Sequence, residues 1–260
     1  MSTFTTRGGL YERARKRCKV KDGQTLFTDR FFRKNRLDAL AFFAEIHKEA
    51  TKASPTSTHK AIMQLAKYFR LRRNYTMNVD GLHRDTGLTT WRHSIGHDSE
   101  TLHNRRQSGE DFSGANGMVV EMHGNIREVV CEECGHVSIV DAAVLKKFSA
   151  SKVCFSDLCA IISVSMLIQC SMQVVHCSKC EAKGKDGVLR FRMLLYDDSQ
   201  QDLVVDDFIE LGQLDDDLSG ADAILWMGIS FEQSASTELF KEVSRSLKEC
   251  GSQGNLTSIR

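Results

Sequence analysis

The chain has 260 residues, of which 41% are hydrophobic and 27% are charged, and its formal net charge is +1 at pH 7. This length is enough for one large domain or two smaller ones with buried cores. The near-neutral charge excludes a global electrostatic attraction to nucleic acid or to an anionic membrane. A basic run at residues 12–19 is interpreted as a solvated helix face.

Cysteine usage indicates a metal site. The chain has nine cysteines, four of which form two Cys-x-x-C pairs, and its first residues do not resemble a secretory signal. This pattern is typical of metal binding in a reducing compartment and not of a disulfide framework. The longest apolar stretch, residues 156–175, is interrupted by Ser163, Ser165 and Gln169, so we expect no membrane helix there.

The first strongly periodic segment is residues 37–50. Leu40, Phe43, Ile46 and His47 recur at helical spacing, which predicts an amphipathic helix with these side chains on its buried face.

Pro55 separates this helix from a second one, which Ser57 or Thr58 is expected to cap. Its predicted apolar face consists of Ile62, Leu65 and Phe69. Residues 71–79 then alternate as a strand and end in the polar loop 80–87. Ligands of α/β proteins bind at such strand ends.

Further along the chain, residues 91–117 are expected to form a long polar surface loop. Its histidines are interpreted as exposed side chains, not metal ligands: His93, His97 and His103. Residues 119–124 and 126–131 predict two short strands. The apolar run at 221–230 predicts a buried strand. Residues 235–250 predict a helix after it. The glycine turn between the strand and the helix is a second candidate site for phosphate or ribose.

The two Cys-x-x-C pairs are Cys131 with Cys134 and Cys177 with Cys180. Each pair can form a knuckle that presents two thiolates, and two knuckles complete a closed tetrahedral zinc site. Residues 153–173 between them form an unusual apolar insert, interpreted either as an insertion or as a stretch absent from the mature protein. An alternative ligand remains open among the cysteines of this insert: Cys154, Cys159 and Cys170.

His123 is followed by Gly124 and lies a short strand before the first knuckle. It could be a zinc ligand, a buried core histidine or a catalytic base. The four paired cysteines fill the coordination sphere of zinc, so the ligand role ranks last. Imidazole keeps a large neutral fraction at neutral pH, which suits a general base.

Several motifs in this order resemble the sirtuins, the NAD-dependent protein-lysine deacylases. They are TTRGGLYE at 5–12, TMNVDGLHRDTG at 76–87, EMHG at 121–124, GVLRFRMLLYDD at 187–198 and ADAILWMGIS at 221–230. Together with the two knuckles, they cover the chain from its N-terminus to about residue 245. Each motif is modest alone, whereas their order and spacing are specific.

The resemblance implies an α/β fold, with a Rossmann-like parallel sheet domain for NAD and an inserted small zinc-ribbon domain. The expected Rossmann-like domain comprises residues 1–125 and 186–260, without the family's first strand and glycine loop. Residues 126–185 are expected to form the zinc-binding domain, with the apolar insert near 153–173. By this comparison the chain is expected to be truncated at both ends.

The resemblance also implies the chemistry. The acyl group passes from lysine to ADP-ribose with release of nicotinamide, and NAD is a co-substrate beside one structural zinc ion. His123 matches the general base toward a ribose hydroxyl. Asn78 and Asp80 match the positions that hold the nicotinamide and the ribose. Gly228 and Ser230 match those that approach the ribose and phosphates.

Departures from the family pattern weaken the expectation of activity, above all the missing glycine loop, whose backbone amides hold the pyrophosphate in the family, and Thr5, which stands in place of an arginine. Met77 replaces a glutamine, Ile229 replaces a threonine, and Tyr196-Asp197-Asp198 replaces Phe-Gly-Glu. The alternative is therefore a catalytically impaired zinc-containing module that binds peptides. A zinc ribbon that binds nucleic acid is disfavoured, because no basic, aromatic-studded strand accompanies the knuckles.

The expected partner is an acylated lysine in a protein or peptide, for example a histone, with no direct nucleic acid and no membrane. The expected location is the nucleus or the cytoplasm, with the nucleus favoured.

Overall fold

The structure is a computed structural model that describes residues 3–92, 117–150, 174–204, 209, 211–219, 221–229, 234–249 and 255–259. Its helices are α1 (Leu10–Cys18), α2 (Asp29–Lys34), α3 (Arg36–Lys52), α4 (Ser57–Lys67), α6 (Ala142–Ala150), α8 (Ser178–Glu181), α9 (Gln213–Ser219) and α10 (Ser234–Glu249). Its strands are β1 (Asn74–Thr76), β2 (Val119–Glu121), β3 (Gly124–Cys131), β4 (Val137–Ile139), β5 (Leu189–Met193), β6 (Ala223–Met227) and β7 (Asn255–Ile259). None of the helices in these described ranges is long and apolar enough to cross a membrane.

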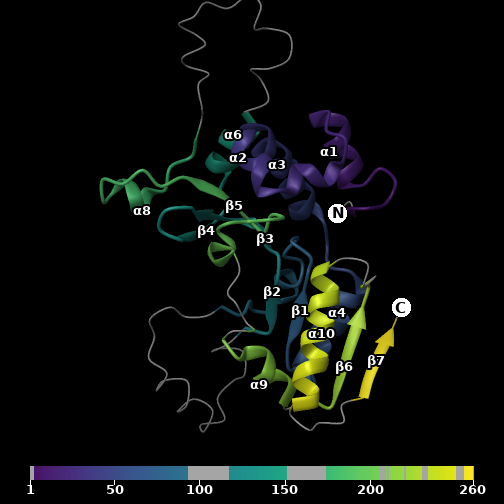
Figure 1. Ribbon diagram of the computed structural model, residues 1–260. Coiled ribbons are helices and arrows are strands. Elements are labelled where there is room, and N and C mark those ends of the chain that lie inside the picture. The colour runs from purple at the N-terminus through teal and green to yellow at the C-terminus, as the bar shows by residue number, and fades with distance from the viewer. Residues whose placement is uncertain are drawn as a thin grey trace, which may run out of the picture.

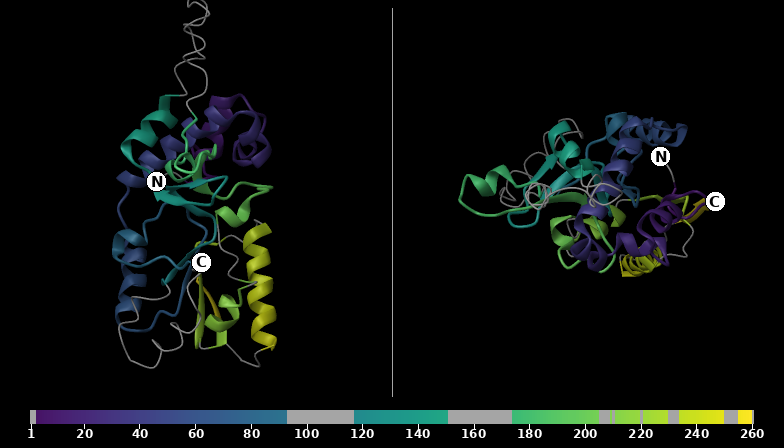
Figure 2. Two further views of the ribbon diagram at one scale, coloured as in Figure 1. Left: turned by 90° about the vertical axis from the view of Figure 1, so that its left-hand side faces the viewer. Right: turned by 90° about the horizontal axis from the view of Figure 1, so that it is seen from above.

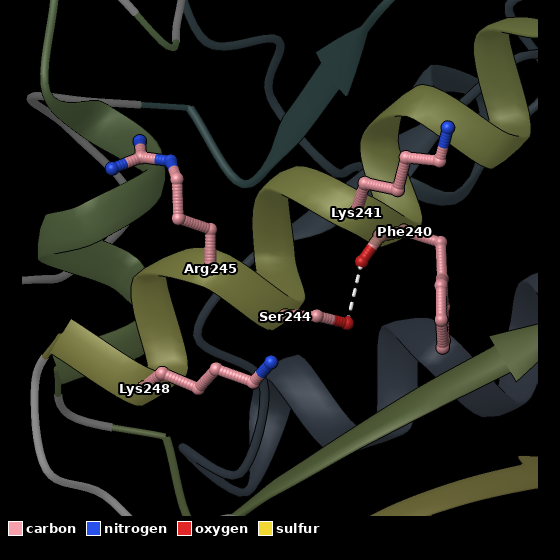
Figure 3. A pocket seen from close by; sticks show the side chains of 5 residues that line it. All are labelled: Phe240, Lys241, Ser244, Arg245 and Lys248. Atoms are coloured by element: carbon pink, nitrogen blue, oxygen red, sulfur yellow. Dashed lines mark hydrogen bonds between the residues drawn. The ribbon is translucent and has the colours of Figure 1, made fainter.

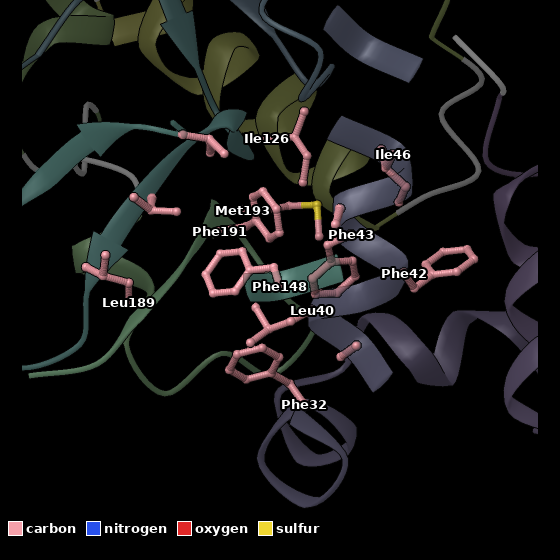
Figure 4. Close-up of a cluster of buried hydrophobic side chains, with 14 of the residues drawn as sticks. Phe32, Leu40, Phe42, Phe43, Ile46, Ile126, Phe148, Leu189, Phe191 and Met193 are labelled. Carbon is pink, nitrogen blue, oxygen red and sulfur yellow. The ribbon is translucent and has the colours of Figure 1, made fainter. Parts of the chain in front are cut away.

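Helix α3 organises the larger hydrophobic core. Leu40, Phe43, Ile46 and His47 are all buried, as their spacing predicts. The core that they join also contains side chains of β3, β5 and α6, and Figure 4 shows them converging on one face of α3. The rings of Phe43 and Phe191 meet edge to face, with centroids 6.4 Å apart. Burial of such rings is a dominant source of core stability.

Strand β3 joins two parts of the molecule that matter for function. It pairs antiparallel with both β4 and β5, in the order β4-β3-β5. Gly124 begins β3 opposite Met193 of β5, and Cys131 ends it opposite Leu189, with a shift of register between Asn125 and Val129. The strand therefore carries the neighbour of His123 at one end and a cysteine of the first knuckle at the other.

Two parallel pairs, β1 with β2 and β6 with β7, form the other half of the fold. In Figure 1 these strands lie below the α3 core, and Figure 2 shows α10 beside β6 and β7, with α4 farther away on the opposite side. Parallel strands flanked by helices are typical of α/β proteins. The predicted α/β class, with parallel strands and an inserted antiparallel unit that carries the cysteines, is confirmed.

The second predicted helix is present, but its cap and its apolar face differ from the prediction. The cap is Thr56, not Ser57 or Thr58, because the Thr56 side chain accepts from the N–H of His59 while the His59 ring reaches back to Thr56. Leu65 and Phe69 are 38% and 75% exposed. Phe69 has φ +56°, beyond the last helical turn, so its ring leaves the periodic face.

The strand expected at 71–79 is shorter in the structure. Only Asn74–Thr76 pair with β2, in a register that matches Thr76 with Glu121. The strand thus ends at Thr76, three residues before the predicted end at Val79.

Strand β6 exists as predicted, but it is not buried throughout. Trp226 is 6% exposed, whereas Leu225 and Met227 are 46% and 40% exposed. The burial alternates because Ile224 and Trp226 face α10 and join a core with Leu239, Val243 and Leu247. A parallel strand is buried on both faces only where helices cover both, and the face of Leu225 and Met227 is largely open among the described residues.

Parts of two predictions lie outside the described residues. These are most of the polar loop, with His93, His97 and His103, and nearly all of the apolar insert, with Cys154, Cys159 and Cys170.

Candidate active site and metal centre

The four cysteines of the two knuckles converge. The Sγ atoms of Cys131, Cys134, Cys177 and Cys180 all lie within 4.8 Å of one another. Cys131 and Cys180 have Sγ atoms 3.6 Å apart, and those of Cys134 and Cys177 are 3.8 Å apart. A disulfide requires about 2.05 Å, so the four side chains are free thiols or thiolates.

These distances fit a tetrahedral metal ion. Four sulfurs at a Zn–S distance of about 2.3 Å are separated by about 3.8 Å at ideal tetrahedral geometry. Gly187 leaves room for the sulfurs, because a Cβ atom there would lie 2.4 Å from the Sγ of Cys180 and 2.7 Å from that of Cys131. The four cysteines are thus positioned to bind a structural zinc ion, and this arrangement needs no ligand from His123.

His123 lies in the tight turn between β2 and β3. Its Nδ1 atom is 3.1 Å from the backbone oxygen of Met77, which follows β1. A carbonyl oxygen can only accept, so Nδ1 carries the proton and Nε2 keeps its lone pair. Burial lowers the pKa of His123, and the hydrogen bond to Met77 opposes that shift. The ring is therefore neutral at pH 7, with Nε2 able to accept a proton.

Asn78 and Asp80 follow β1 and belong to the loop beside His123. Asn78 is exposed, and its backbone N–H donates to Thr76 Oγ1 at 3.2 Å. Asp80 is buried, and its Oδ1 accepts from the N–H of Leu82 at 3.0 Å. Parallel strands β1 and β2 end at the same edge, which brings the Asn78 loop and the His123 turn together.

The end of β6 approaches the same region. Ile229, which follows Gly228, packs against the hydrophobic cluster that Met77 and Met122 also contact. Gly228 has φ +65°, and a Cβ atom there would meet no atom of the described residues within 4 Å, its chain neighbours aside. Gly228 therefore directly precedes a residue that shares a hydrophobic cluster with Met77 and Met122, while the predicted Ser230 is outside the described residues.

Sequence reasoning missed a buried network behind His123. The carboxylate of Glu121 accepts hydrogen bonds from Asn125 Nδ2 at 2.6 Å and from Arg84 Nη2 at 2.7 Å. Arg84 Nη1 also donates to Glu128 at 2.7 Å. Glu121 and Arg84 stand inside the motifs EMHG and GLHRDTG. The available signal was therefore Glu121 alone, a charged residue in a predicted strand otherwise expected to bury apolar side chains.

The segment after β5 is hydrogen-bonded both to the His123 turn and to the segment 27–29. The backbone N–H of Leu194 donates to the oxygen of His123 at 3.0 Å. Tyr196 donates to Phe27 O at 2.8 Å and accepts from the N–H of Asp29 at 2.9 Å. Both backbone groups of Tyr196 are therefore hydrogen-bonded within the chain, to the segment 27–29.

Comparisons with known proteins show similarity to Sir2 proteins. The profile of the Sir2 family matches residues 1–101. The NAD-dependent histone deacetylase HST3 of Saccharomyces cerevisiae is 32% identical over 139 residues, which cover 50% of this chain and 28% of that protein. The NAD-dependent protein deacetylase sir-2.1 of Caenorhabditis elegans is 25% identical over 189 residues, which cover 72% of this chain and 23% of that protein.

The fold agrees with these relatives. A Sir2 homologue in complex with ADP-ribose superimposes with a TM-score of 0.59 at 17% identity, covering 99% of this chain and 73% of that one. Sir2Tm bound to a propionylated peptide gives a TM-score of 0.55 at 19% identity, covering 90% of this chain and 71% of that one. The chain is therefore similar to the Sir2 family in sequence over residues 1–101 and to Sir2 structures in fold. Its matched regions span 28% and 23% of the lengths of the two sequence relatives.

One hollow among the described residues is not at the candidate site. It has a volume of about 410 Å³ and lies along α10, lined by Phe240, Lys241, Ser244, Arg245 and Lys248 (Figure 3). Ser244 donates to the backbone oxygen of Phe240 at 2.7 Å. None of the predicted site residues lines this hollow, so we give it no part in the chemistry.

Proposed function

We propose that this chain is an NAD-dependent protein-lysine deacylase, which transfers the acyl group of lysine to ADP-ribose and releases nicotinamide. The observation that carries the proposal is the His123 turn. The neutral His123 ring donates its Nδ1–H to the Met77 carbonyl. Its Nε2 lone pair lies at the edge where the parallel strands β1 and β2 end.

In this proposal His123 is the general base. Its Nε2 atom takes a proton from a hydroxyl group brought to the strand ends, and the Met77 carbonyl stabilises the resulting imidazolium through Nδ1–H. The low pKa of the buried ring keeps it unprotonated at neutral pH before the reaction. Backbone oxygen, and not the Met77 side chain, makes this contact, so the replacement of glutamine by Met77 leaves it intact.

The proposed co-substrate contacts are Asn78, Asp80, Gly228 and Ser230. The exposed Asn78 carboxamide can orient an amide group by paired hydrogen bonds. Asp80 is held by the Leu82 N–H, which fixes its carboxylate for a hydroxyl. The open backbone at Gly228 lets a ligand approach closely. NAD, when bound, supplies the activated bond to nicotinamide and the ADP-ribose that receives the acyl group.

The proposed zinc ion has a structural role. Cys131, Cys134, Cys177 and Cys180 would hold it through four thiolates, which leaves no open position for catalysis. The proposed division of the chain remains a Rossmann-like domain of residues 1–125 and 186–260 and a zinc-binding domain of residues 126–185.

The proposed substrate is an acylated lysine in a protein, and a histone is a candidate because the yeast relative is named a histone deacetylase. The bound propionylated peptide of a solved relative supports an acyl-lysine peptide as the ligand class. The name of the same yeast relative supports the nucleus as the proposed site of action, with the cytoplasm as the alternative.

The second candidate is a zinc-containing module that binds acyl-lysine peptides without turnover. The open flank of β6 favours it, because Leu225 and Met227 are exposed where a complete parallel sheet is covered. If NAD binds only weakly at the open side of β6, the chain binds acyl-lysine peptides but does not turn them over.

One experiment separates the two candidates. The purified full chain, with its metal content measured, is incubated with NAD and an acetyl-lysine peptide, and nicotinamide release and peptide affinity are both recorded. Nicotinamide release that requires the acetylated peptide supports the deacylase. Binding of the acetylated peptide over the unmodified one, without nicotinamide release, supports the module and overturns the deacylase.

A further inference from the structure

We propose that Glu121 is a positioning residue that ties the His123 turn to the loop carrying Asn78 and Asp80. This inference rests on the proposed function for its catalytic meaning, but its structural part stands on buried contacts alone. Glu121, Asn125 and Arg84 together are called the Glu121 clamp.

The first half of the clamp closes the turn. Glu121 and Asn125 flank Met122, His123 and Gly124, and the hydrogen bond from Asn125 Nδ2 to Glu121 Oε1 is 2.6 Å long. Glu121 is 5% exposed, and Asn125 is fully buried. The bond spans the three residues of the turn, so it limits how far the His123 ring can move.

The orientation of the Asn125 amide is itself fixed. Its Oδ1 accepts from the backbone N–H of Arg127 at 2.9 Å, which requires Nδ2 to face Glu121. Gly124 adds a second constraint, because its φ is +77° and a Cβ atom there would lie 2.4 Å from the backbone oxygen of Arg192. The turn therefore has one compatible arrangement of its polar groups.

The second half of the clamp holds the opposite loop. Arg84, four residues beyond Asp80, donates from Nη2 to Glu121 Oε2 at 2.7 Å. Its remaining nitrogens are also used, Nη1 by Glu128 and Nε by Thr90, each at 2.7 Å. Gly81 packs directly on the clamp, since a Cβ atom there would lie 2.9 Å from Asn125 Nδ2. Glu121 is thus hydrogen-bonded to both segments at once.

The carboxylate is chemically necessary for this double contact. A carboxylate accepts on both oxygens, whereas a carboxamide accepts on one side and donates on the other. Glu121→Gln keeps the shape, but its NH2 group must face either the Asn125 amide or the Arg84 guanidinium. One of the two buried links is then lost and a donor faces a donor. The substitution Glu121→Gln therefore tests the hydrogen bonds of the clamp without creating a cavity.

The design uses a matched control and a rescue. Asp217→Asn is the control, because Asp217 is also 5% exposed and accepts from Arg73 Nε at 2.7 Å, but it lies on α9 and contacts no residue of the clamp. The rescue is the double variant Glu121→Gln with Asn125→Asp. In this variant the new amide at position 121 can donate to a carboxylate at position 125 while its oxygen still accepts from Arg84.

The first measurement does not depend on activity. Nitrogen-15 NMR of the His123 ring in the metal-loaded full chain reports which ring nitrogen carries the proton. The wild type and Asp217→Asn are expected to show the Nδ1–H tautomer. Glu121→Gln is expected to show a mixture, because the ring loses its fixed contact with Met77, and the double variant is expected to recover the wild-type signal.

The second measurement is nicotinamide release with NAD and an acetyl-lysine peptide. Glu121→Gln is expected to lower kcat at least about tenfold with little change in peptide KM, and the double variant is expected to recover most of it. A wild-type tautomer and rate in Glu121→Gln, equal losses in Asp217→Asn, or no recovery in the double variant would overturn the proposal. If the tautomer changes as expected but the wild type releases no nicotinamide, the clamp stands and the proposed function fails.

Discussion

The two sides of the candidate site are built in different ways. On the His123 side, Glu121, Glu128 and Asn125 are buried, and arginine side chains donate to both carboxylates. On the β6 side, no atom of the described residues other than the chain neighbours of Gly228 lies within 4 Å of where a Cβ atom of Gly228 would be, and the flanking Met227 is 40% exposed. The same chain therefore presents a closed polar network on one side and an open strand end on the other.

This difference shows which part of the site is preorganised by the chain itself. A buried ion network must keep its geometry, because a displaced partner leaves a charge without compensation. An open strand end has no such constraint, so its geometry depends on what binds there. We expect substitutions on the His123 side to affect stability strongly, and those on the open face of β6 to affect it little.

The largest effect is expected at the cysteine cluster, which shares the α3 core. Cys177→Ser should lower the bound metal from about one ion per chain to none and destabilise the fold by at least about 5 kcal/mol, because metal binding and folding are coupled. Metal analysis and urea unfolding measure both. Cys18→Ser, on α1 and outside the cluster, should change neither, and equal metal in both variants would contradict the assignment.

The two faces of β6 should respond differently to truncation. Trp226→Ala removes a ring that packs against α10 and should destabilise by about 3–5 kcal/mol. Leu225→Ala, on the open face, should destabilise by less than about 1 kcal/mol. Urea unfolding of the two variants gives both values. Similar losses of unfolding free energy in the two variants would contradict the exposure of the Leu225 face of β6.

Glycine substitutions separate backbone strain from crowding. Gly124 and Gly184 both have positive φ, but only Gly124 would bring a Cβ atom within 4 Å of other groups. Gly124→Ala should destabilise by about 2–4 kcal/mol, and Gly184→Ala by about 1 kcal/mol. Equal values in thermal or urea unfolding would show that the His123 turn can shift to make room.

The smallest expected effect is a loss of folding stability at acidic pH that depends on His83. Burial, and then the neighbouring His59, lower the pKa of His83 from 6.5 to about 4. The unfolded chain takes up a proton below about pH 6.5, whereas folded His83 stays neutral, so its contribution to stability is complete above that pH and is lost as the pH falls toward 4. Between pH 7.5 and 5.5 the loss should be about 1 kcal/mol.

His83→Asn should remove this part of the pH dependence. Urea unfolding gives the free energy of unfolding of the wild type and of His83→Asn at pH 7.5 and at pH 5.5. The contributions of His47 and His123 are the same in both proteins and cancel when the two pH dependences are subtracted. An unchanged pH dependence would contradict the buried neutral state of His83.

Local patterns were sufficient to predict much of the fold. Helical spacing of Leu40, Phe43 and Ile46 located α3, and the two Cys-x-x-C pairs located a cluster whose sulfurs meet in space. These predictions succeeded because the signal lies within one element or one knuckle. The strand β1 was also predictable, but its end at Thr76 was not, because the residues before Asp80 still include the strand former Val79.

Long-range partners could not be predicted. The exposure of Leu225 and Met227 depends on what covers β6, which no residue of β6 encodes. The Met77 carbonyl contact to His123 joins residues 46 positions apart. Glu121 was visible in its motif, but its double contact with Asn125 and Arg84 requires three segments to be folded together.

The central claim is that His123 Nε2 is the general base of an NAD-dependent deacylase. The most direct measurement is nicotinamide release from NAD with an acetyl-lysine peptide by the wild type, His123→Ala and, as a control on the knuckle side, His136→Ala, all with equal metal content. We predict release by the wild type and by His136→Ala, and a loss of at least about 100-fold in His123→Ala. Unchanged release in His123→Ala would contradict the claim.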